Sequence, residues 1–82
     1  MSAPLPAVID FEAAHPASTP RKEVLIRKTF GLSAARYYQR LNAILTTSVL
    51  LTQALEHDPS TTNRLLTAIA DRAAKRTRKV NP

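Results

Sequence analysis

One short segment carries the side-chain types that proteins use to contact nucleic acid. Arg36, Gln39 and Arg40 fall on one face of a predicted helix, and arginine and glutamine hydrogen-bond to base edges and phosphates. Ser33 and Tyr38 lie at the start and along the side of the same segment and are further candidates for contacting a duplex. A solvated helix face that binds nothing is the alternative interpretation of these residues.

The basic residues have the distribution expected of a polyanion-binding protein. The 82-residue chain has 12 Lys and Arg against six Asp and Glu, which gives a net charge of +6 and an isoelectric point near 10.6. All the cations lie in two blocks, 21–40 and 64–79. A basic surface that serves solubility alone is the alternative, although such surfaces usually mix both signs. The residues predicted to bind phosphate are Arg21, Lys22, Arg72, Lys75, Arg76, Arg78 and Lys79.

The segment that carries Arg36 follows a predicted tight turn. Gly31 is the only glycine of the chain, and it lies where a helix-turn-helix needs a residue with positive φ. Ser33 is placed to cap the following helix, and Thr19 with Pro20 is a typical start for the preceding one. These signals predict a helix-turn-helix over residues 20–45.

The positive end of the first of these helices carries an unfavourable pair of charges. Arg21 and Lys22 lie where the helix dipole disfavours cations, which hints at an anionic partner nearby. Arg27 occupies a position where the general pattern usually has a small residue. The angle between the two helices should therefore differ from the usual one unless this side chain extends into solvent.

Apolar spacing predicts an all-α domain of four to five helices. Thr46-Thr47-Ser48 predicts a break after the third helix, and a single helix over 34–56 is the alternative. A last helix begins near Ser60, and its apolar stripe ends at Ala74. The expected organisation is a flexible tail at 1–6, a helical domain at 7–74, and a basic segment at 75–82 that is an exposed last turn or a mobile tail.

The two tyrosines receive different predictions. Tyr37 shares a helix face with Leu41 and Ile44, so we expect it in the core with its hydroxyl at the edge. Tyr38 lies between the buried and exposed faces. It either packs on the fourth helix or donates a hydrogen bond to a phosphate.

Composition argues against several other functions. The acidic residues are scattered, there is no cysteine, and one glycine is too few for a nucleotide-binding loop. We therefore expect neither an enzyme nor a metal or cofactor site. No segment is long and apolar enough to span a bilayer, and the start lacks a secretory signal. A cytoplasmic, nucleoid-associated protein is expected.

The segment from Phe30 to Asn42, FGLSAARYYQRLN, resembles a family of short actinobacterial and phage proteins of uncharacterised function. The Phe11-Glu12 pair, the Asp58-Pro59 step and the arginine-rich last helix are similar to that family as well. The likeness covers most of residues 8–79. It implies a helix-turn-helix domain of actinobacterial or phage origin, and it brings no ligand with it.

Together these features predict a DNA-binding protein of sequence-preferring or nucleoid type, most simply a transcriptional regulator. Its partner would be double-stranded DNA, with a possible homodimer through the fourth or fifth helix. The alternative is a protein-interaction module that docks on an acidic partner such as the transcription machinery, because the fold serves both purposes. RNA binding is a third hypothesis, although two Tyr and two Phe offer few stacking platforms.

Overall fold

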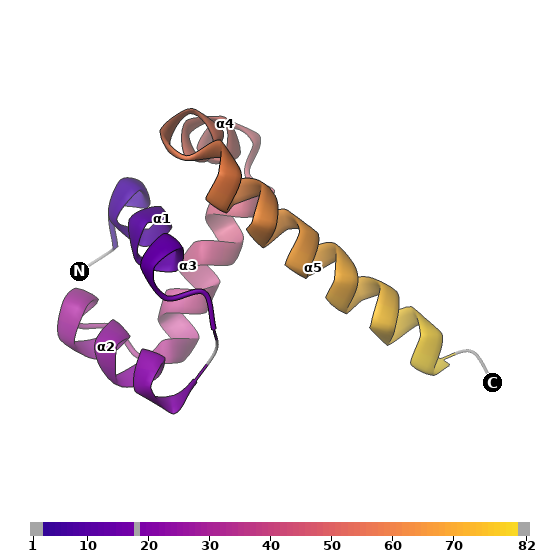
Figure 1. Cartoon of the computed structure of the whole chain (residues 1–82), viewed down its shortest axis with the longest axis horizontal. Helices are drawn as coiled ribbons and strands as arrows, with labels where there is room; N and C mark the ends of the chain where they lie inside the picture. The colour runs from indigo at the N-terminus through magenta and orange to yellow at the C-terminus, as the bar shows by residue number, and fades with distance from the viewer. Residues whose placement is uncertain (1–2, 18, 81–82) are drawn as a thin grey trace.

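In a computed structural model, the chain is described over residues 3–17 and 19–80, with side chains described up to Asp71. This part of the chain is entirely helical, which confirms the predicted class. Its helices are α1 (Leu5–Ala14), α2 (Pro20–Phe30), α3 (Ala34–Thr46), α4 (Ser48–His57) and α5 (Pro59–Val80). The first four form a compact body, and α5 extends from it as an arm (Figure 1).

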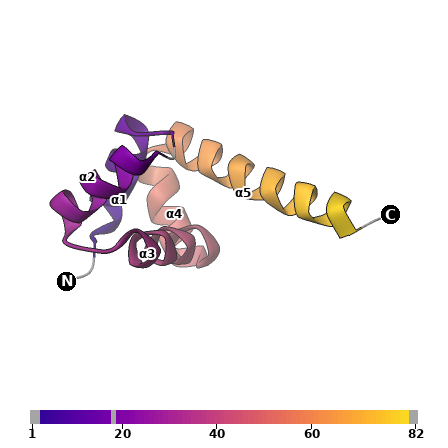
Figure 2. The ribbon, with the colours of Figure 1, turned by 90° about the horizontal axis from the view of Figure 1, so that it is seen from below.

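The arm packs on the body near its beginning. The first turns of α5 pack on α1, α3 and α4, and the rest of the helix leads away from the body in both ribbon views (Figure 2). The backbone of 75–80 continues α5 beyond Ala74, where the apolar pattern ends. No helix in the described part of the chain is long and apolar enough to cross a membrane. The side chains of Arg72, Lys75, Arg76, Arg78 and Lys79, all predicted to bind phosphate, lie outside the described ones.

The start of the chain differs from its prediction as a tail at 1–6. Ala3 is only 2% exposed, Leu5 is also buried, and α1 begins at Leu5, before the expected start of the helical domain at residue 7. Proline in the first turn accounts for the earlier start, because the amide that it lacks has no helical acceptor there. The apolar Leu5 then joins the core, so residues 3–6 belong to the domain.

The predicted break after the third helix is confirmed, and the single helix over 34–56 is wrong. Thr47 has an extended backbone (φ −101°, ψ 118°) and both ends α3 and precedes α4. The break allows α4 to fold back against α3 and α1. Ala54 of α4 is fully buried as a result.

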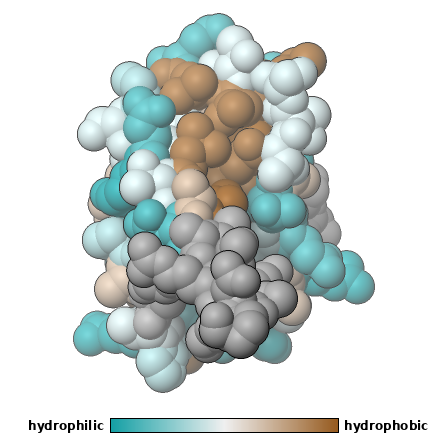
Figure 3. Space-filling view, turned by 90° about the vertical axis from the view of Figure 1, so that its right-hand side faces the viewer, coloured by the Kyte–Doolittle hydropathy of each residue, from teal (hydrophilic) through white to brown (hydrophobic). Residues whose placement is uncertain are grey.

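The core is formed mainly by α1 and α3, with one buried apolar side chain each from α2 and α4. The Phe11 ring of α1 contacts Phe30 of α2 at 5.4 Å and Tyr37 of α3 at 5.7 Å between centroids, both edge to face. Apolar side chains also gather on the face from which α5 emerges (Figure 3). The buried apolar residues of the described chain are Ala3, Leu5, Val8, Ile9, Phe11, Ile26, Tyr37, Leu41, Ile44, Leu45 and Ala54.

The connection from α4 to α5 is fixed by an N-terminal cap. Asp58 accepts hydrogen bonds from the Thr61 amide at 3.1 Å and from the Thr61 hydroxyl at 2.7 Å. Both bonds lower the pKa of Asp58 because they favour its ionised form, and the bond from the amide contributes most. The helix begins at Pro59, one residue before the predicted start.

Candidate nucleic-acid interface

The turn between α2 and α3 has the predicted local structure. Gly31 adopts the left-handed conformation (φ 69°, ψ 19°), and its amide donates to the Arg27 carbonyl at 2.9 Å. The Ser33 hydroxyl accepts a hydrogen bond from the Arg36 amide at 3.3 Å, and Thr19 caps α2 through the Lys22 amide at 3.2 Å. The predictions for Gly31 and for both caps are therefore confirmed.

An outward face of α3 carries two of the predicted DNA-contacting residues. Arg36 and Gln39 are exposed, and neither side chain has a hydrogen bond to another described residue. Asn42 is exposed three residues further along, so it extends the same polar edge by one turn. Arg27 is exposed as well, so the charge of its side chain is not buried between α2 and α3.

Arg40 has a structural contact that its sequence position did not reveal. Its side chain is half-buried, and Nε donates a hydrogen bond to the Ala3 carbonyl at 2.9 Å. This bond ties the start of the chain to α3. One nitrogen of its guanidinium is therefore bonded inside the molecule. This corrects the expectation that Arg40 is as available to DNA as Arg36.

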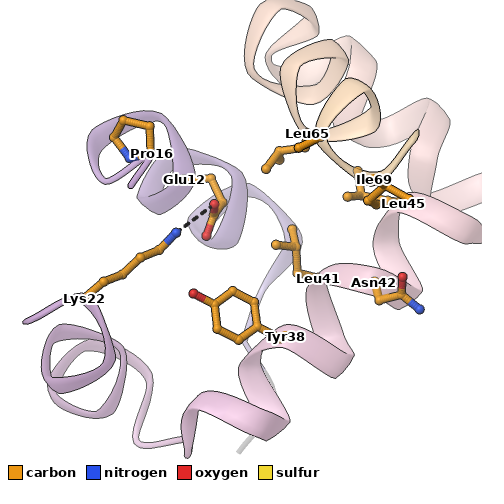
Figure 4. Close-up of a pocket in the computed structure, with 10 residues that line it drawn as sticks. Glu12, Pro16, Lys22, Tyr38, Leu41, Asn42, Leu45, Leu65 and Ile69 are labelled. Atoms are coloured by element: carbon orange, nitrogen blue, oxygen red, sulfur yellow. Dashed lines mark hydrogen bonds and ion pairs between the residues drawn. The ribbon is translucent and has the colours of Figure 1, made fainter. Parts of the chain in front are cut away.

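Lys22 is not an exposed phosphate ligand, which corrects its prediction. Its ammonium nitrogen lies 3.0 Å from Glu12 Oε1, and both side chains are 3% exposed. The anion beside Lys22 is therefore a carboxylate of this chain, contributed by α1 (Figure 4). The neighbouring Arg21 is exposed and stays a candidate for phosphate.

The Glu12 carboxylate connects α1, α2 and α3. Its second oxygen, Oε2, accepts a short hydrogen bond from the Tyr37 hydroxyl, so one carboxylate joins α1 to both α2 and α3. Tyr37 is fully buried, as predicted for its ring, but its hydroxyl is inside rather than at the edge. Burial raises the pKa of Tyr37, and the hydrogen bond to Glu12 raises it further.

Tyr38 takes a third position that neither prediction included. Its ring lies 5.8 Å from the Lys22 ammonium, within the range of a cation–π contact. The hydroxyl end points toward Lys22 and Glu12 (Figure 4). Tyr38 is 36% exposed, so it lies at the border between the buried ion pair and solvent.

Two further polar contacts between distant segments were not predicted. Arg64 of α5 donates to the Glu12 carbonyl at 2.9 Å, and His57 Nε2 lies 2.7 Å from Asp10 Oδ1. Both join residues about fifty positions apart, and no local pattern marks such pairs. Among residues 3–17 and 19–71, no group of three or more His, Cys, Asp or Glu side chains is placed to hold a metal ion.

A protein-family model matches the chain. The model of a family described as "Protein of unknown function (DUF3263)" matches residues 2–77, which is nearly the whole chain. No curated protein and no solved structure matches the chain.

Proposed function

The chain belongs to the DUF3263 family, and we propose that it binds double-stranded DNA by a helix-turn-helix formed by α2 and α3. The observation that carries this proposal is the outward face of α3, where Arg36 and Gln39 are exposed directly after a capped turn. Arginine and glutamine pair with guanine and adenine edges in the major groove, so this face has the chemistry for sequence preference. The protein would act as a transcriptional regulator or a nucleoid component.

The charge balance supports a polyanion as the partner. Glu12 and Lys22 cancel each other inside the protein, which leaves 11 Lys and Arg against five acidic residues. Two of those five are also engaged, because Asp10 contacts His57 and Asp58 caps α5. The exposed cations Arg21, Arg27 and Lys28 of α2 would contact phosphates beside the groove.

The buried network supports the proposal through geometry. A recognition helix must be held at a fixed angle to the helix before it. Glu12 bonds to Lys22 of α2 and to Tyr37 of α3, so it fixes these two helices relative to each other. The helix that carries the exposed face is therefore held in place by these buried hydrogen bonds.

Fluorescence anisotropy with labelled duplexes at several salt concentrations tests the proposal. If about six phosphates are neutralised, the logarithm of the affinity falls with the logarithm of salt concentration with a slope of about −5. Arg36→Ala and Gln39→Ala should each weaken binding to a preferred site about tenfold or more, because each removes a base contact. A random duplex pool, enriched by selection and sequenced, supplies that site.

Gln53→Ala is the matched control for Gln39→Ala, since both glutamines are exposed on helices but Gln53 lies on α4. It should leave the affinity unchanged. Absence of binding to any duplex at low salt, or equal losses in the two glutamine variants, would contradict the proposal.

An acidic protein partner is the second candidate function. Val24 is exposed on α2 one turn from Arg21 and Lys28, so this face offers an apolar contact between two cations. If it is the functional surface, Val24→Ser will abolish capture of an acidic partner from the transcription machinery, while Arg36→Ala and Gln39→Ala will not change DNA binding.

A homodimer would add a second half-site to the proposed DNA complex. Val49 on α4 and Ile69 on α5 are exposed apolar residues, so either helix offers an apolar contact to a second copy of the chain. Light scattering with and without duplex measures the mass directly. A monomer on a single half-site would remove the dimer from the proposal without affecting the DNA contact.

A further inference from the structure

A cavity of about 170 Å³ lies between the body and the base of α5 (Figure 4). Leu41 of α3 and Leu65 and Ile69 of α5 form its apolar part. Ile69 is 37% exposed, so this part is open to solvent. Water there lies against aliphatic side chains and forms fewer hydrogen bonds, so its displacement by an apolar group favours binding.

The polar part of the lining carries one charge of each sign. Glu12 and Lys22 are paired at 3.0 Å between Oε1 and Nζ, so their charges cancel. The Tyr38 hydroxyl points toward this pair (Figure 4) and has no hydrogen bond to another described residue. Among the described residues, no other charged side chain lines the cavity. The polar part therefore offers hydrogen-bond donors and acceptors without a net charge.

This balanced ion pair disfavours a charged ligand. A carboxylate placed beside Lys22 also lies close to Glu12, because only 3.0 Å separate the two charged groups. Attraction and repulsion then nearly cancel, and the same holds for an ammonium group with the signs reversed. Either ion loses its hydration in the cavity without a net opposite charge to replace it. A neutral ligand avoids this cost.

A hydroxyl group matches the paired charges better than an ion does. It can donate one hydrogen bond and accept others, so it can donate to the Glu12 carboxylate and accept from the Lys22 ammonium or the Tyr38 hydroxyl. The ammonium carries three N–H groups, and its described hydrogen bond is the one to Glu12. Hydrogen bonds to ionised partners are stronger than neutral ones, so they can replace those that the hydroxyl makes to water.

We propose that this cavity binds a small neutral alcohol or phenol with one apolar ring. The hydroxyl group lies at the Glu12–Lys22 pair, and the ring lies among Leu41, Leu65 and Ile69. The volume suits one ring, because a protein cavity of about 150 Å³ accepts benzene. This site goes beyond the proposed function, and it stands whether or not the protein binds DNA.

Titration of the ¹⁵N-labelled full chain with benzyl alcohol, followed by NMR, tests the proposal. Saturable shifts should appear at the amides of the cavity residues, with a dissociation constant on the order of 1 mM for so small a ligand. Benzoate and benzylammonium are the matched controls, since they carry the same ring with a negative or a positive charge. Each should bind about tenfold more weakly, because the cavity does not compensate the lost hydration of an ion.

A matched pair of substitutions on α5 locates the binding. Ala68 lines the cavity, whereas Ala70 does not, and both are exposed, so tryptophan at either position leaves the core intact. Ala68→Trp should fill the cavity and weaken the binding of benzyl alcohol about tenfold or more. Ala70→Trp should leave it unchanged. Absence of saturable shifts with benzyl alcohol, equal or tighter binding of either ion, or equal effects of the two substitutions would overturn the proposal.

Discussion

Cations occur on both sides of α3, but the two sides use them differently. On the inner side, the Lys22 ammonium is buried against Glu12, and Tyr37 bonds to the same carboxylate. On the outer side, Arg36 is exposed and its side chain contacts no described acidic residue. Lys22 and Arg36 belong to one basic block of the sequence. The block therefore contains one cation that joins helices inside the protein and another that is available to a partner.

The difference shows that the number of Lys and Arg residues in the sequence overstates how many cations are available for binding. A buried charge must be paired, so removal of either partner of the pair lowers the free energy of unfolding. An exposed charge contributes little to folding, so its presence is better explained by a partner or by solubility. Substitutions on the two sides of α3 should accordingly affect different measurements.

The largest effect is expected for Glu12→Ala. It leaves the buried Lys22 without its counter-ion and the Tyr37 hydroxyl without its acceptor, which should cost about 3–5 kcal/mol of unfolding free energy. That is a large part of the stability of a small domain, about 5–15 kcal/mol. Urea unfolding followed by circular dichroism measures it. The control, Glu56→Ala at an exposed position of α4, should change stability by less than about 0.5 kcal/mol.

Tyr37→Phe and Tyr38→Phe form a matched pair across the border of the buried network. Loss of the Tyr37 hydroxyl leaves one Glu12 oxygen without its donor and should cost about 1–3 kcal/mol. Loss of the Tyr38 hydroxyl, which has no hydrogen bond to another described residue, should cost less than about 0.5 kcal/mol. Equal costs would show that the network does not stabilise the fold.

The burial of Tyr37 also predicts how the stability of the fold depends on pH, and the same two variants test this. Because burial raises the pKa of Tyr37 in the folded state, its stabilising effect is complete below the unfolded value of about 10. Stability then falls as pH rises above that value, since the unfolded chain loses the proton first. Phenolate absorbance should therefore show a step that coincides with alkaline unfolding. Tyr37→Phe should lack this step, whereas Tyr38→Phe should retain it.

Gly31→Ala should have an intermediate effect, because it acts on the connection between α2 and α3. A Cβ at this position would have no atom within 4 Å, so the cost comes only from positive φ, about 1–2 kcal/mol. Gly31→Asn should cost less, since asparagine tolerates this conformation better. Thermal unfolding of the two variants checks the order, and an equal cost would contradict the backbone explanation.

The smallest effect on folding is expected for Arg36→Ala. Its side chain is exposed and unpaired among the described residues, so stability should change by less than about 0.5 kcal/mol. Any loss of DNA affinity in this variant would then be a loss of contact and not of fold. A destabilisation like that of Glu12→Ala would remove the distinction between the two sides of α3.

Features that depend on neighbouring residues in the chain could be predicted. Gly31, Ser33 and Thr19 have the conformations and capping bonds expected of them, and the break near Thr47 is present. These follow from local backbone preferences and short-range hydrogen bonds. The place of Ala3 in the domain could not be predicted from its neighbours in the sequence. Its carbonyl accepts a hydrogen bond from Arg40, which lies far along the chain.

The helices, their caps and the excess of positive charge could be predicted from the sequence, since each depends on residues a few positions apart or on composition. The exposure of each cation depends on tertiary contacts, because Lys22 pairs with Glu12 inside the protein and Arg40 donates a hydrogen bond to the Ala3 carbonyl. The cavity beside Lys22 is another tertiary feature, because side chains of α1, α2, α3 and α5 line it together. Burial and charge pairing depend on the packing of distant segments, which spacing along the chain does not encode.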